Sequence, residues 1–120
     1  MAVTPSYRIF VLELLNRAVP PVRARSMFSG IGLYAGQTFF ALIADDILYF
    51  KTDPVTRQQY EAHGMMAFRP HGDDTIVMSY HQVPEHVLED TDLLRTWAER
   101  AITIARAKPK RGGRKVRRKR

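Results

Sequence analysis

One ten-residue segment, Arg25 to Tyr34, constrains the fold of this chain more than any other. It reads Arg-Ser-Met-Phe-Ser-Gly-Ile-Gly-Leu-Tyr, with two glycines separated by one residue among apolar and aromatic side chains. Glycine has no Cβ, so Gly30 and Gly32 mark a place where the chain bends, bulges or is closely approached by another backbone. A helix that opens here would indicate a nucleotide-binding loop, whereas flanking strands would make the segment part of a scaffold.

The same segment matches a dinucleotide-binding pattern. Residues 30–35 read Gly-Ile-Gly-Leu-Tyr-Ala, which fits Gly-x-Gly-x-x-Ala, and Asp53 follows at about the distance expected of a ribose-binding carboxylate. That mechanism needs a helix that begins at the second glycine and holds the pyrophosphate. Gly36 interrupts such a helix, and residues 37–44 are too short and too rich in aromatics for it. A glycine-mediated bulge or turn between strands is our interpretation, and a nucleotide-binding protein or enzyme is the alternative.

Hydrophobic periodicity predicts a helix at each end of the folded part. Thr4 and Pro5 are typical of a helix start, and Pro20-Pro21 ends the first helix. A second helical region begins at Val83-Pro84, is capped again at Asp90 or Thr91 and ends at Lys108-Pro109. The apolar stripe of the first helix contains Tyr7, Phe10, Val11, Leu14, Leu15 and Ala18. The stripe of the last contains Leu93, Leu94, Trp97, Ala98, Ala101 and either Ile104 or Ala105.

Runs of branched and aromatic residues predict the strands between these helices. Strands are expected at residues 23–28, 37–44 and 47–51, with Asp45-Asp46 as a tight turn. A short helix over residues 55–63 then follows Thr52-Asp53-Pro54 and ends at Gly64. Two more strands, 65–69 and 75–80, are joined by a hairpin loop at 70–74.

The predicted order is thus helix, three antiparallel strands, short helix, two strands and C-terminal helix. Short loops favour antiparallel neighbours, so the predicted fold class is α+β rather than doubly wound α/β. The first and last helices are expected to cover one face of the sheet. Because residues 39–43 look apolar on both sides, the other face is a candidate surface for a homodimer.

The residue types exclude several kinds of catalytic and metal site. Cysteine is absent, which excludes disulfides, thiolate catalysis and Cys-ligated metals. The four histidines lack the spacing of zinc ligands, and both Asp-Asp pairs fall where hairpins need turn residues. From these residues we therefore predict no metal site. No secretory signal or membrane-spanning stretch is recognisable, so we expect a cytoplasmic protein.

The tyrosines and phenylalanines of the predicted strands have two interpretations. Gathered on one sheet face, they would form a stacking platform for nucleic-acid bases. Turned inward, they would be core residues, which is the commoner role at strand spacing. The residues concerned are Tyr34, Tyr49, Tyr60, Tyr80, Phe39, Phe40, Phe50 and Phe68.

The positive charge of the chain is concentrated in its last residues. Residues 108–120 contain nine Lys or Arg and no acid, whereas residues 1–107 contain ten Lys or Arg and all twelve Asp or Glu. We therefore divide the chain into a folded domain, 1–107, and a basic tail, 108–120, which is expected to be disordered alone. Nucleic-acid phosphates are the expected partner of the tail, an idle tail is the alternative, and no amphipathic or lipidation pattern favours a membrane. The expected phosphate contacts are Lys108, Lys110, Arg111, Arg114, Lys115, Arg117, Arg118, Lys119 and Arg120.

Several segments along the chain together carry a family resemblance. They are Arg25 to Tyr34, residues 39–44 and 48–53, Met78-Ser79-Tyr80 with Val83-Pro84, and Leu93-Leu94 with Trp97-Ala98. With these in place, about residues 7–106 resemble the N-terminal domain of the TfoX/Sxy competence-regulator family. Ser29 stands where the family usually has the first glycine of Met-Phe-Gly-Gly. The basic tail follows where full-length regulators of this family carry a second domain.

The resemblance implies an α+β domain laid out like secretion-chaperone-like folds, and a role in regulating gene expression linked to DNA uptake. It implies no catalytic residue and no cofactor. We therefore expect a non-enzymatic regulator whose folded domain binds an unidentified protein partner or itself, and whose tail holds nucleic acid. The expected partner-binding or structural motif contains Arg25, Met27, Phe28, Gly30, Gly32 and Tyr34. A chaperone-like dimer with an idle tail is a further alternative.

Overall fold

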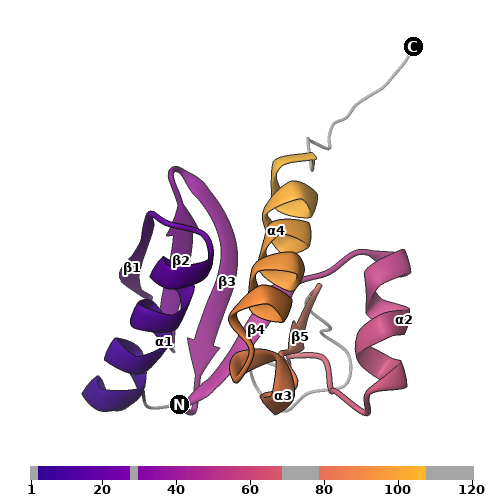
Figure 1. Cartoon of the computed structure of the whole chain (residues 1–120), viewed down its shortest axis with the longest axis horizontal. Coiled ribbons are helices and arrows are strands. Elements are labelled where there is room, and N and C mark those ends of the chain that lie inside the picture. Colours follow the sequence, from indigo (N-terminus) through magenta and orange to yellow (C-terminus); the bar gives the residue numbers. More distant parts are fainter. Residues whose placement is uncertain (1–2, 28–29, 69–78, 108–120) are drawn as a thin grey trace.

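The computed structural model describes residues 3–27, 30–68 and 79–107, which form an α+β domain (Figure 1). In chain order its elements are α1 (Pro5–Ala18), β1 (Val22–Met27), β2 (Gly30–Ala35), β3 (Thr38–Ala44), β4 (Ile47–Lys51), α2 (Pro54–Ala62), β5 (Tyr80–Gln82), α3 (Glu85–Leu88) and α4 (Thr91–Ala107). The predicted fold class is therefore confirmed. The predicted basic tail, 108–120, and the predicted loop, 70–74, lie outside the described residues.

The five strands form one antiparallel sheet in the order β1-β2-β3-β4-β5 (Figure 1). The turn between β3 and β4 consists of Asp45 and Asp46, whose φ angles are 53° and 57°. Positive φ at both central residues is the type I′ geometry that suits the twist of a hairpin. The Asp46 carboxylate also accepts hydrogen bonds from the backbone N–H and the hydroxyl of Thr4, at 2.8 and 3.0 Å. The predicted turn is confirmed, and it also holds the start of α1.

Residues 30–35 form strand β2, so Gly30 and Gly32 do not lie in a turn between strands, whereas the close approach of another backbone that the glycines also predicted is found at Gly30. Within β2, Gly32 pairs with Arg25 on one side and with Leu42 on the other. No helix opens at Gly32, so the dinucleotide-binding interpretation is wrong. Asp53, the candidate ribose-binding carboxylate, stabilises a helix instead. Its carboxylate accepts two backbone N–H bonds from the first turn of α2, at 3.0 and 2.8 Å. It is an N-cap, and those hydrogen bonds lower its pKa.

A β-bulge lies next to this strand, in β3. Leu33 pairs with Ala41 and Tyr34 pairs with Phe39, so Phe40 is an extra residue without a partner opposite it. Both Phe40 and Ala41 are buried on the helix side of the sheet. The bulge shifts the alternation of side chains by one residue, and Phe39 consequently lies on the opposite face.

Helices α1 and α4 lie on one side of the sheet and cover its apolar face (Figure 1). The helix residues buried there are Val11, Leu15 and Ala18 of α1 and Leu94, Trp97, Ala98, Ala101 and Ile102 of α4. Two stripe predictions are wrong, since Phe10 is 46% and Leu93 is 38% exposed. The buried arc of α4 starts at Leu94 and continues one position beyond Ala101, so Leu93 falls outside it and Ile102 falls within it.

The predicted strands 65–69 and 75–80 are only partly found. Residues 66–68 run beside β5 and form a single bridge, between Ala67 and His81, rather than a strand. Strand β5 is Tyr80–Gln82, so it begins where the predicted strand ended. Residues 69 and 75–78 lie outside the described part of the chain.

Gly30 is required by the close approach of a neighbouring backbone. A Cβ at this position would overlap the carbonyl oxygen of Ile43, with the carbonyl carbon at 3.2 Å. We therefore expect Gly30→Ala to force a backbone shift and to lower the free energy of unfolding by about 1–3 kcal/mol in urea denaturation. Ser26→Ala, an exposed position in the facing strand, should change it by less than about 0.5 kcal/mol. Equal stability of the two variants would contradict this account of Gly30.

A buried polar pair joins β5 to the segment before α2. His81 and Thr52 are 2% and 3% exposed, and the His81 Nδ1 lies 3.0 Å from the Thr52 hydroxyl. Burial lowers the pKa of His81 from its ordinary 6.5, while the Glu61 carboxylate, 4.0 Å from Nε2, opposes this shift and Arg57 adds to it. The folded domain thus favours a neutral imidazole.

This pair predicts a pH-dependent stability. The unfolded chain protonates His81 near pH 6.5, before the folded chain does, so stability present above that pH should be lost as the pH falls through 6.5 toward the lowered value. His81→Asn keeps a neutral hydrogen-bonding group near the Thr52 hydroxyl but cannot be protonated, so urea denaturation between pH 5 and 7.5 should show a smaller loss of stability for this variant. His86→Asn, at an exposed position in α3, is the matched control and should keep the wild-type profile. If His81→Asn loses as much stability as the wild type when the pH is lowered from 7.5 to 5, His81 is not the source of the pH dependence.

Candidate functional site

The strand register sorts side chains onto two faces of the sheet. Residues directly opposite each other in antiparallel strands point to the same face. Leu33 and Phe50 lie on the helix side, so their neighbours in sequence lie on the other side. We call this second side the aromatic face. Its strand residues are Arg23, Arg25, Met27, Gly30, Gly32, Tyr34, Phe39, Leu42, Ala44, Ile47, Tyr49, Lys51, Tyr80 and Gln82.

A row of aromatic rings crosses this face at one end of the sheet. The Tyr34 and Phe39 rings are stacked, with centroids 5.3 Å apart and planes at 29°. Phe39 and Tyr80 continue the row at 5.6 Å. We call these three residues the aromatic stripe. Tyr34 and Phe39 are half-buried, whereas Tyr80 is only 5% exposed and supports the row from its side.

Cations flank the aromatic stripe at both of its ends. The Arg23 guanidinium lies 5.2 Å from the Tyr34 ring centroid, and the Lys51 ammonium lies 5.1 Å from that of Tyr80. The five described strands contain Arg23, Arg25 and Lys51 and no Asp or Glu, and all three cations are on the aromatic face. Burial, aided by Tyr34, raises the pKa of Tyr80 to about 12, so its phenol adds no negative charge.

Gly32 allows the rings to lie close to the sheet. A Cβ there would come within 2.6 Å of the Met27 sulfur and 3.2 Å of a Phe39 ring carbon. The glycine therefore leaves a depression that the neighbouring side chains fill. The middle of the same face holds a small second apolar cluster, which includes Leu42 and Phe68. Tyr80 belongs to this cluster and Phe39 packs against it, so the cluster is continuous with the aromatic stripe.

Five of the six motif residues that we predicted come together on the aromatic face. Arg25, Met27, Gly30, Gly32 and Tyr34 belong to the β1–β2 hairpin and share this face because of their register. The sixth, Phe28, lies outside the described residues. The sequence analysis did not single out Arg23 or Lys51. The alternation of Arg23 with Arg25 in β1 was the available signal, because alternate residues of a strand share a face.

The structure divides the aromatic residues that we considered as a stacking platform. Phe40, Phe50 and Tyr60 belong to the core beneath the helices. Tyr34, Phe39, Tyr49, Phe68 and Tyr80 belong to the cluster or contacts of the aromatic face. The core interpretation is therefore confirmed for the first subset, and base stacking stays a prediction for the second.

The predicted phosphate-binding residues, 108–120, lie outside the described part of the chain, but the helix that precedes them is placed. Near the end of α4, Ala105 lines a shallow pocket of about 310 Å³ together with Phe39, Lys51 and Tyr80. One residue on, the Arg106 Nε donates a hydrogen bond to the hydroxyl of Thr38 at 3.4 Å. Helix α4 therefore ends, at Ala107, near the aromatic stripe.

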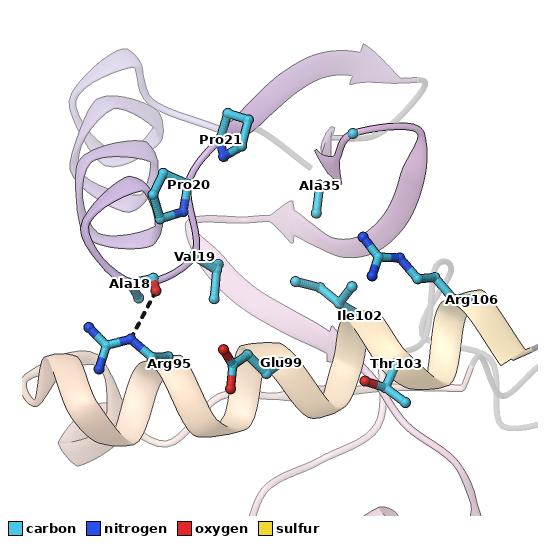
Figure 2. Close-up of a pocket in the computed structure, with 11 residues that line it drawn as sticks. Ala18, Val19, Pro20, Pro21, Ala35, Arg95, Glu99, Ile102, Thr103 and Arg106 are labelled. Atoms are coloured by element: carbon cyan, nitrogen blue, oxygen red, sulfur yellow. Dashed lines mark hydrogen bonds between the residues drawn. The ribbon is translucent and has the colours of Figure 1, made fainter.

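A second hollow lies on the helix side, between the end of α1, the β2–β3 turn and α4 (Figure 2). This groove has a volume of about 730 Å³ and contains Arg95, Glu99 and Arg106 along one side of α4. Figure 2 shows the Arg95 Nε donating to the carbonyl oxygen of Ala18, at 3.1 Å. Arg95 also contacts the Asp92 carboxylate at 3.0 Å. The Arg95–Ala18 hydrogen bond joins α4 to α1, whereas the Arg95–Asp92 pair lies within α4. We therefore interpret the groove as the packing boundary between the two helices.

Across 3–27, 30–68 and 79–107, no group of three His, Cys, Asp or Glu side chains could hold a metal ion. None of the described helices has the length and apolar character needed to cross a membrane.

Comparison with known proteins gives one family match. The model of the TfoX N-terminal domain matches residues 13–105, which is more than half of the chain and includes the whole β1–β4 sheet region and most of α4. A search among curated proteins gave no match. The match agrees with the resemblance carried by the glycine segment and indicates a TfoX-like regulatory role. The chain belongs to the TfoX N-terminal domain family.

Proposed function

We propose that this protein is a non-enzymatic, cytoplasmic regulator of the TfoX type, with a role in competence. In this proposal the basic tail contacts nucleic acid without sequence preference, and the folded domain binds a protein partner. The observation that most directly supports the contact with nucleic acid is the concentration of positive charge in the tail. The nine cations of residues 108–120 have no acid among them, whereas residues 1–107 have ten Lys or Arg and twelve Asp or Glu. Nothing in the tail offsets its attraction to a polyanion.

The partner surface that we propose is the end of the aromatic face at which Met27 lies. Met27 is 45% exposed and Arg25 is also exposed, so an apolar and a cationic group are available side by side. Strand β1 is an edge of the described sheet, where a strand from a partner can add. A homodimer through this face would bring Arg25 and Arg23 toward their own copies. Because like charges repel, a partner with acidic groups fits better than a second copy.

The tail proposal predicts a steep salt dependence. Full-length protein should bind duplex DNA and single-stranded RNA, and with about half of the tail cations engaged the log-log slope of affinity against salt should be roughly −4. A chain that ends at Ala107 should lose most of this binding. Titrations by fluorescence anisotropy over a salt series measure both quantities.

A full-length variant with the nine tail cations replaced by Gln is the matched control, because it keeps the length of the tail and removes its charge. It should behave as the truncated chain does. Unchanged binding after truncation would move the site onto the folded domain. Absence of binding by every form would remove nucleic acid from the proposal and favour a chaperone-like dimer with an idle tail.

A further inference from the structure

We propose that the aromatic stripe binds a single-stranded segment of nucleic acid, with bases on Tyr34 and Phe39 and phosphates on Arg23 and Lys51. This inference rests on the proposed contact between the tail and nucleic acid, and it adds a second site on the folded domain. It also predicts that the bound nucleic acid is single-stranded. The tail alone does not distinguish a single strand from a duplex, because it contacts phosphates and both contain them.

The ring geometry provides a stacking surface. The Tyr34 and Phe39 rings stack on each other with centroids 5.3 Å apart, and both side chains are half-buried, so part of each remains exposed. Tyr80 packs against Phe39 at 5.6 Å and limits its movement. Bases stack on such aromatic side chains with little sequence preference, and a sheet face is a common support for them.

The charges suit a strand that runs along the stripe. Arg23 is exposed and stands at the Tyr34 end, while Lys51 stands at the Tyr80 end. The described strands contribute no carboxylate to this face, so no acidic group of the sheet opposes a phosphate. An Arg guanidinium can also stack on a base, so Arg23 can remain over Tyr34 or turn toward a phosphate.

The start of the tail provides the third line of support. Ala105 shares the pocket of about 310 Å³ with Phe39, Lys51 and Tyr80, and α4 ends two residues later at Ala107. A nucleic-acid strand held by the tail would therefore be close to the aromatic stripe.

Other occupants fit the same surface less well. A second copy would place its own Arg23 and Lys51 near these cations, and the tail of the same chain would add nine more positive charges. In duplex DNA the bases are already stacked and paired, so they are not available to the rings. A single strand supplies both free base faces and negative charge.

The test compares a short poly-thymidine strand with a duplex of equal length, using the full chain at one salt concentration. The wild-type protein should bind the single strand more tightly. Tyr34→Leu and Phe39→Leu should each weaken single-strand binding about tenfold and leave duplex binding unchanged. Phe10→Leu, at an exposed aromatic on α1 away from this face, is the matched control and should change neither.

Ultraviolet crosslinking of the thymidine strand to the wild-type protein provides a readout that does not depend on how the variants fold. Crosslinked peptides should include residues 30–44, which contain Tyr34 and Phe39. Equal affinity for strand and duplex, or crosslinks confined to residues 108–120, would overturn the inference. If truncation at Ala107 still abolishes duplex binding in that case, the proposed function stands and only the role of the stripe is lost.

Discussion

Burial of one sheet face beneath α1 and α4 is the constraint on which the rest of this structure depends. Side chains of a strand alternate, so placing Leu33 and Phe50 under the helices commits their sequence neighbours to the other face. Tyr34 and Lys51 are such neighbours. A slip of one residue would bring Lys51 into the core, where an unpaired ammonium is strongly disfavoured. The position of the cations is therefore fixed by the packing of the core.

The bulge at Phe40 is what completes the aromatic stripe. Regular alternation back from Ile43 and Ala41, which are in the core, would turn Phe39 toward the helices and Phe40 away from them. The extra residue reverses this order, so Phe40 enters the core and Phe39 stacks on Tyr34. One irregularity in the ladder thus improves the packing beneath the sheet and also lengthens the row of rings above it.

Local patterns were sufficient to predict the helices, the cap at Asp53 and the turn at Asp45-Asp46, because each depends on neighbours in sequence. The glycines were predicted to mark a bend, a bulge or a close approach of another backbone, because glycine is unfavourable inside strands. Its place in the sheet depends on partners distant in sequence: the Ile43 carbonyl over Gly30, and the Met27 and Phe39 side chains over Gly32. The motif residues are close in sequence, so they were recognised as a group. Which face they share, and which cations lie beside them, depends on the pairing of the strands and could not be predicted from the sequence.

The order of the elements also links the tail to the stripe. Helix α4 crosses the sheet and ends at the edge where Phe39, Lys51 and Tyr80 lie, so the last helix that builds the core also sets the origin of the tail. In our proposal, a nucleic-acid strand bound by the tail would meet the stripe as a tethered ligand, at a raised effective concentration. Stacking on two half-buried rings would then need only modest affinity to be occupied. The tail alone would give attraction to any polyanion, and the rings alone would give weak binding, so the choice of a single strand would come from their proximity.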